Sequence, residues 1–257
     1  MDVLENTIIF TIARMNPPTP GHIYLLENMI ELALQKNVSQ INIILSSTID
    51  DEKNPVECEE KRQILYNYGV ITAKQNLEVK YPDKVNEIES IKAEIICLND
   101  QIDSKYGSSP VVAKFNYLLY NNYKYPRPNM KAILVVGEDR KNDYVFFEKM
   151  LQKLEFPVSF ELFVVDRPDS AISATKIRQL ATSRNPEDEK TFEEYMNTIG
   201  MEKNEASRLI NQIRENIDPT PKIKKIKIKG GSKKGKSRKL KKNKKNKKSK
   251  KSRKYKK

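Results

Sequence analysis

The 257-residue sequence has few of the side chains that build disulfide frameworks or Cys/His metal sites. Its two cysteines, Cys58 and Cys97, cannot form a disulfide framework, which favours a reducing compartment. With a single histidine, His22, a zinc site of the Cys/His type is disfavoured. A Ser-His-Asp or Cys-His mechanism would have to use His22, which narrows the search for such chemistry to one place.

Long apolar segments are also missing. No run approaches the roughly 18 residues that a membrane-spanning helix needs. The first six residues carry acidic side chains where a secretory signal needs basic ones. There is no internal repeat and no hydrophobic heptad pattern. We therefore expect an intracellular protein, cytoplasmic or nuclear, that is not secreted and has no transmembrane segment.

Acidic and basic residues are unevenly distributed. The net charge is +14, but residues 222–257 hold 20 lysines, 2 arginines and no acid, a charge of +22. The other 221 residues hold 26 basic and 34 acidic side chains, a net charge of −8. We expect an acidic globular part and a disordered lysine-rich tail, because the tail has almost nothing to bury. Such a tail suits nucleic acid or another polyanion, an import signal, a membrane-surface anchor or a solubilising role.

Short apolar, β-branched runs alternate with helical patterns along the acidic part. This alternation predicts an α/β fold, a Rossmann-like doubly wound parallel sheet of about five strands. We expect the strand order 3-2-1-4-5. Residues 74–87 favour neither helix nor strand. Residues 1–185 would form the Rossmann-like domain, and residues 186–221 a C-terminal helical extension before the tail. The expected strands are 7–13, 41–45, 93–98, 132–136 and 160–165.

In an open parallel sheet, a ligand lies at the carboxyl ends of the strands, where the strand order reverses. In the order 3-2-1-4-5, that crevice separates the first strand from the fourth. The loops that follow these strands are Arg14–His22, which contains three prolines, and Gly137–Arg140. We expect these two loops to face each other across a binding site.

The first loop ends in Thr19-Pro20-Gly21-His22, where the first strand leads into the first helix. Gly21 allows the backbone to approach a ligand closely. Thr19, His22 and the first main-chain amides of the helix would donate hydrogen bonds to a phosphate, aided by the helix dipole. The alternative is a proline-rich turn whose histidine only caps a helix.

A second group of donors occurs in the run Ile172-Ser173-Ala174-Thr175-Lys176-Ile177-Arg178. Ser173 is a good N-cap, and Thr175 lies in the first turn of the helix that follows. Lys176 and Arg178 come within the next turn, so hydroxyls, amides and cations converge on one helix end, as a polyphosphate requires. The alternative is an ordinary capped amphipathic helix with solvated cations.

Together, the two runs resemble the nucleotidyltransferase superfamily marked by (His/Thr)-x-Gly-His and a later Ile-Ser-x-Thr-x-x-Arg. The resemblance covers roughly residues 5–185. The run Ala13–His22 is similar to the Gly-Arg-Phe-Gln-Pro-Phe-His-x-Gly-His of nicotinamide-mononucleotide adenylyltransferases, with Ala13, Asn16 and Thr19 among the departures. Gly137-Glu138-Asp139 resembles a nucleotide-contacting Gly-x-Asp. Asn54-Pro55 with Lys61 and Arg62 is similar to a helix that frames the second substrate.

The resemblance implies transfer of a nucleoside monophosphate, AMP from ATP, to a phosphorylated acceptor such as nicotinamide mononucleotide, with release of pyrophosphate. Mg²⁺ would be held mainly by the substrate phosphates, without a metal site on the protein. The alternatives are a cytidylyltransferase that uses CTP, and a non-catalytic nucleic-acid-associated protein that acts through its tail. The implied roles are catalytic for His22, Thr19, Arg178 and Lys176, nucleotide or phosphate binding for Arg14, Gly21, Gly137, Asp139, Ser173 and Thr175, and acceptor binding for Asn54 and Arg62.

Overall fold

The computed structural model describes residues 6–50, 53–97, 110–144, 146–154, 158–166, 168 and 172–217. Residues 1–220 form one compact unit, and residues 221–257 are a separate one. The lysine-rich tail expected at 222–257 lies outside the described residues. No helix in the described part of the chain is both long and apolar enough to cross a membrane.

The central element is a five-stranded, all-parallel sheet in the order β3-β2-β1-β4-β5, which confirms the predicted fold class. Ile9 of β1 lies opposite Ile41 of β2 on one side and Ile133 of β4 on the other. Because helices cover both faces of such a sheet, its strands are apolar along most of their length. The strands are β1 (Thr7–Ala13), β2 (Gln40–Leu45), β3 (Lys92–Cys97), β4 (Lys131–Gly137) and β5 (Ser159–Val165).

The helices account for most of the remaining described chain. Residues 70–90, whose pattern favoured no structure over much of its length, are helical with one short break. Two helices, α2 and α6, run on into single π-helical turns, at Leu65–Gly69 and Leu118–Asn122. The α-helices are α1 (Pro20–Lys36), α2 (Cys58–Ile64), α3 (Val70–Lys80), α4 (Val85–Ser90), α6 (Pro110–Tyr117), α7 (Phe146–Leu151), α8 (Ala174–Thr182), α9 (Pro186–Asn197) and α10 (Lys203–Ile217), with 3-10 turns at Pro82–Lys84 and Glu138–Tyr144.

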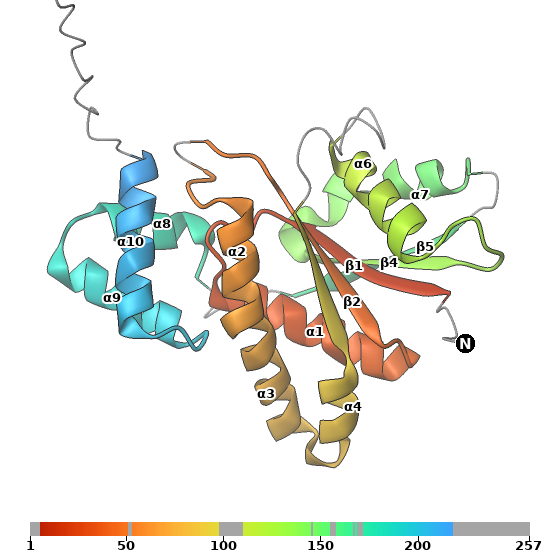
Figure 1. Cartoon of the computed structure of the whole chain (residues 1–257), viewed down its shortest axis with the longest axis horizontal. Coiled ribbons are helices and arrows are strands. Elements are labelled where there is room, and N and C mark those ends of the chain that lie inside the picture. The colour runs from red at the N-terminus through yellow and green to blue at the C-terminus, as the bar shows by residue number, and fades with distance from the viewer. Residues whose placement is uncertain are drawn as a thin grey trace, which may run out of the picture. The chain divides into compact units, whose positions relative to one another are not determined.

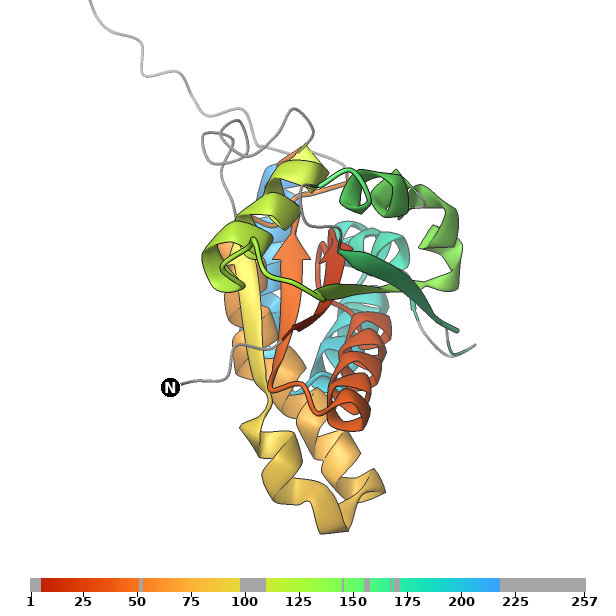
Figure 2. The same cartoon turned by 90° about the vertical axis from the view of Figure 1, so that its right-hand side faces the viewer.

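The two faces of the sheet bury separate cores. Side chains such as Ile9 and Ile43 pack with α1, α3 and the C-terminal helices. Their neighbours Phe10 and Ile44 point to the opposite face and pack with α6 and α7. Figures 1 and 2 show α6 and α7 on one side of the sheet and α1 on the other. The alternation along each strand therefore divides the interior into two layers.

The C-terminal helices belong to the first of these cores. Phe192 and Met196 of α9 and Ile210 of α10 are buried in the same cluster as α1. Arg214 of α10 donates to the main-chain oxygen of Ala181 (2.6 Å) and pairs with Glu189. These contacts hold the last helices against α8, whose first turn carries the second predicted motif.

The two cysteines meet in the folded chain. Cys58, the first residue of α2, is bonded to Cys97, the last residue of β3, with an S–S distance of 2.10 Å and a Cα–Cα distance of 5.8 Å. One bridge is not a framework, but the cysteine count no longer supports a reducing compartment. The bridge joins α2 to the edge of the sheet at which β3 ends.

Candidate functional site

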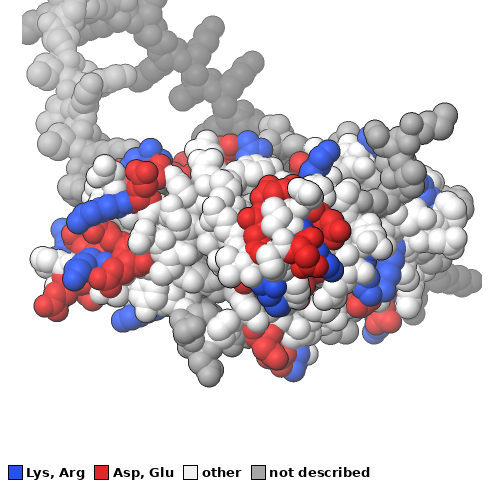
Figure 3. Space-filling view, turned by 90° about the horizontal axis from the view of Figure 1, so that it is seen from below, with Lys and Arg blue, Asp and Glu red and all other residues white. Residues whose placement is uncertain are grey.

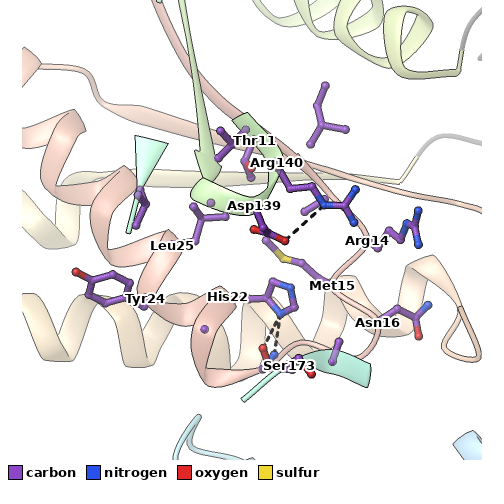
Figure 4. A pocket seen from close by; sticks show the side chains of 18 of the residues that line it. Thr11, Arg14, Met15, Asn16, His22, Tyr24, Leu25, Asp139, Arg140 and Ser173 are labelled. Carbon is purple, nitrogen blue, oxygen red and sulfur yellow. Dashed lines mark hydrogen bonds and ion pairs between the residues drawn. The ribbon is translucent and has the colours of Figure 1, made fainter. Parts of the chain in front are cut away.

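A cavity of about 470 Å³ opens at the carboxyl ends of β1 and β4. Its walls come from the β1–α1 loop, the residues after β4 and the start of α8, so the two predicted loops and the second motif do meet. Figure 4 shows His22 in the middle of the labelled side chains, with Asp139 and Arg140 on one side and Ser173 on the other. The lining includes nine of the residues singled out in the sequence, namely Arg14, Thr19, Gly21, His22, Gly137, Asp139, Ser173, Thr175 and Arg178.

The first turn of α1 fixes the His22 ring. Thr19 is the N-cap, and its main-chain N–H donates to Nδ1 of His22 (3.0 Å). The Thr19 hydroxyl lies 2.9 Å from the same nitrogen. Because Nδ1 accepts a hydrogen bond from an amide, the ring proton is on Nε2. His22 thus occupies the position that a glutamate takes in an ordinary capping box, and the Thr19 hydroxyl is directed to the histidine.

Hydrogen bonds to the segment that precedes α2 hold the β1–α1 loop in place. The Asn16 side chain forms two hydrogen bonds with the main chain of Val56, from Nδ2 to the oxygen (2.8 Å) and from the amide to Oδ1 (3.0 Å). Met15, next to it, is buried and has a left-handed backbone with φ of 44°. Such a conformation is unfavourable for a methionine and persists only where surrounding contacts impose it.

Arg178 joins the second motif to this loop. Its Nη1 donates to the main-chain oxygen of Asn16 (2.6 Å), and its Nη2 donates to Oγ1 of Thr175 (3.2 Å). Burial lowers the pKa of Arg178 from its ordinary value, although the guanidinium stays charged. At the start of α8, Ser173 accepts a hydrogen bond from the amide of Lys176 (3.1 Å), as an N-cap does.

Charges of both signs line the cavity. Arg14, Lys53 and Arg178 lie together, and they also line a second cleft next to the main cavity. On the β4 side, Arg140 pairs with Asp143 (2.8 Å) and lies 3.8 Å from Asp139. The pairing with Asp143 raises the pKa of Arg140. The cavity therefore has a cationic end near α8 and a mixed end near β4.

Three predicted site residues do not line the cavity. Lys176 is exposed on α8, and only its amide takes part in the cap. Asn54 is buried and donates from Nδ2 to Asp50, where it shapes the turn before α2. Arg62 pairs with Glu59 on the surface of α2 (2.6 Å). The helix that was expected to frame a second substrate thus turns Arg62 away from the cavity.

The predicted catalytic and binding roles did not include Lys53, Tyr144 or Lys61, which the structure brings to the site. Lys53 lines the cavity next to Arg14. Tyr144 also lines it and donates from its hydroxyl to the main-chain oxygen of Ile12 (3.1 Å), and burial raises its pKa. Lys61 is completely buried beneath the cavity. The apolar spacing of Lys61 with Ile64 and Leu65 was a signal that this lysine faces inward.

The arrangement suits an anion of several phosphates. Amides of two helix starts, an imidazole and three arginines converge on one cavity. Within the described ranges, no three His, Cys, Asp or Glu side chains gather in a way that could hold a metal ion. In comparisons with known proteins, no family model and no curated sequence matches this chain.

Proposed function

We propose that the protein is a nucleotidyltransferase that transfers AMP from ATP to a phosphorylated acceptor, such as nicotinamide mononucleotide, and releases pyrophosphate. The observation that carries the proposal is the hydrogen bond from Arg178 to Asn16, which joins two motifs 162 residues apart at the wall of one cavity. Each motif alone has an ordinary structural explanation. Their convergence at the switch point of a parallel sheet supports a nucleotide site.

The reaction needs no nucleophile from the protein. An oxygen of the acceptor phosphate attacks the α-phosphorus of ATP, the bond from that phosphorus to the bridging oxygen breaks, and pyrophosphate leaves. In the proposed roles, Nε2–H of His22 donates to the triphosphate and Arg178 stabilises charge on the departing pyrophosphate. Ser173 and Thr175 bind the same phosphates at the start of α8. Catalysis then consists of positioning two anions and stabilising the charge that develops between them.

Mg²⁺ fits this proposal as an ion carried by the substrate. Among the described residues, Asp139 and Asp166 are the carboxylates that line the cavity, too few for a protein cage of oxygen ligands. Bound through the phosphates, the ion would neutralise part of their charge. Arg14, Lys53 and Arg178 would supply the rest of the positive charge from the protein side.

The test is pyrophosphate release in the presence of Mg²⁺, with ATP or CTP and a panel of phosphorylated acceptors that includes nicotinamide mononucleotide. We expect turnover with ATP, and we expect His22→Ala to lower kcat by about 10²–10³-fold. Lys36→Ala, at the exposed far end of the same helix, is the matched control and should retain the wild-type rate. Equal rates for wild type and His22→Ala under every condition would overturn the proposal.

The tail supports a second, separate proposal about partners. Residues 222–257 carry +22, while the rest of the chain carries −8. Figure 3 shows acidic side chains gathered on one face of the folded part, over the end formed by α3 and α4 and over the C-terminal helices. We therefore infer that binding of nucleic acid or another polyanion depends on the tail. A protein that ends at Pro221 should keep its turnover and lose the salt-dependent binding of an oligonucleotide; loss of turnover with retained binding would contradict this division.

A further inference from the structure

Lys61 is the most deeply buried cation among the described residues. It lies on α2 with no part of its side chain exposed to solvent. Within the part of the chain that the structure describes, no carboxylate lies within ion-pair distance of its Nζ. Burying an ammonium without an acid is costly, and such a group is retained only where other contacts use its charge.

The contacts of Lys61 are two main-chain carbonyls at the floor of the cavity. Its Nζ donates to the oxygen of Arg14 (3.1 Å), just after β1, and to the oxygen of Ser46 (2.7 Å), just after β2. Arg14 and Ser46 both line the cavity. The carboxyl ends of parallel strands present carbonyl oxygens, whose partial negative charge repels a phosphate. An ammonium bound to two of these oxygens offsets that repulsion and ties the two strand ends together.

The same loop is held at a second point. The Arg14 carbonyl is bound by Lys61 and the Asn16 carbonyl by Arg178, on either side of the left-handed Met15. Two cations from different helices thus bind the carbonyls on the two sides of Met15. This part of the loop leads to Thr19 and His22 a few residues later in the chain. The position of the loop therefore sets the position of these proposed phosphate donors.

We propose that Lys61 is a positioning residue of the anion site, which fixes the β1–α1 loop and neutralises the strand-end carbonyls beneath the bound phosphates. This role rests on the proposed function for the nature of the anion. It is independent of whether the anion is turned over.

The test uses pyrophosphate with Mg²⁺ as the probe and calorimetry on the full chain. We expect Lys61→Met, which keeps the length of the side chain and removes its charge, to raise the pyrophosphate Kd at least about tenfold. Lys61→Gln, which keeps one donor, is the second neutral variant in case the first does not fold. Lys74→Met is the matched control, because Lys74 also donates to a main-chain oxygen, that of Glu89 (2.8 Å), away from the cavity.

The pH dependence separates a role of the charge from a role in packing. Burial, with a smaller contribution from Lys114 on α6, lowers the pKa of Lys61 to about 8. The groups on α2 beside it are Glu60, which contacts α10, and Arg62, which pairs with Glu59. As the pH rises through 8, wild type should lose pyrophosphate affinity relative to Lys61→Arg, whose guanidinium stays charged. Ionisation of the ligand is common to both proteins and cancels in the comparison.

The outcomes of this experiment are distinct. If the folded Lys61→Met protein binds pyrophosphate as wild type does, or if wild type and Lys61→Arg show the same pH dependence, Lys61 has no positioning role and the transferase proposal stands. If affinity depends on Lys61 but no nucleotide is turned over, the positioning role stands and the transferase proposal fails. If wild type binds no pyrophosphate at all, both fail.

Discussion

Arg178 donates from Nη1 to the main-chain oxygen of Asn16 over 2.6 Å, while its Nη2 reaches the hydroxyl of Thr175. A planar fork with two donors spans these two acceptors, which lie on different elements. A lysine would supply the same charge but only a single point from which to donate. Arg178 therefore connects α8 to the β1–α1 loop through a hydrogen bond, and it also places a positive charge at the cavity.

Arg178→Lys should lower kcat of the proposed reaction about 10–100-fold, because the charge remains but the fork is lost. Steady-state rates of pyrophosphate release measure the effect. Arg208→Lys, on the exposed face of α10, is the control and should have wild-type rates. Full activity of Arg178→Lys would mean that the bond to Asn16 has no part in forming the site.

Much of the fold was predictable because its strands are continuous β-branched runs bounded by turns. The predicted run 7–13 coincides with β1. The motif residues were also predictable, because residues that directly follow a strand or begin a helix are placed by the topology itself. His22 and Arg178 needed no knowledge of distant side chains to be assigned to one edge of the sheet.

The rest of the site depends on contacts across the chain. Lys61 and Arg62 are adjacent, and a helix turns by about 100° per residue, so one faces the floor of the cavity while the other pairs with Glu59. The spacing of Lys61 with Ile64 and Leu65 indicates which of the two faces inward, but the two carbonyls that Lys61 binds come from distant loops and could not be predicted. The bridge of Cys58 to Cys97 likewise requires the placement of α2 against the end of β3, which residue spacing does not reveal.

The structure favours Lys53 over Arg62 as a contact for phosphates. Lys53 lines the cavity with Arg14 and Arg178, whereas Arg62 lies outside it. We expect Lys53→Ala to raise the KM of ATP or of the acceptor by about tenfold, and Arg62→Ala to change neither. The pair of variants, measured side by side, tests the position of the site. A larger effect at Arg62 would place the acceptor on the outer face of α2.

Lys61 should also affect stability in a pH-dependent way. Its pKa falls from 10.5 to about 8 in the folded protein, so between these values the unfolded chain binds more protons than the folded one. The free energy of unfolding therefore increases with pH across this window, by about 3 kcal/mol from this group. Urea unfolding at pH 7.5 and pH 10, values that span most of this window, measures the increase. The Lys61→Met protein should lack the increase in unfolding free energy that Lys61 contributes. If the unfolding free energies of wild type and Lys61→Met depend on pH in the same way, Lys61 is not a buried, charged lysine in the folded protein.

The disulfide should contribute to stability more than to the site. The bridge closes a loop with a sequence separation of 39, and the loss of chain entropy in the unfolded state corresponds to about 4 kcal/mol. Reduction should therefore move the urea midpoint of wild type down to that of Cys58→Ser/Cys97→Ser, while the double variant should not respond to reductant. Because Lys61 and Asn16 anchor the β1–α1 loop through their own hydrogen bonds, pyrophosphate affinity should stay within about threefold of wild type while the reduced protein is folded. A loss of affinity on reduction at low urea, before unfolding begins, would show instead that the bridge to β3 holds α2 in the position that Lys61 needs.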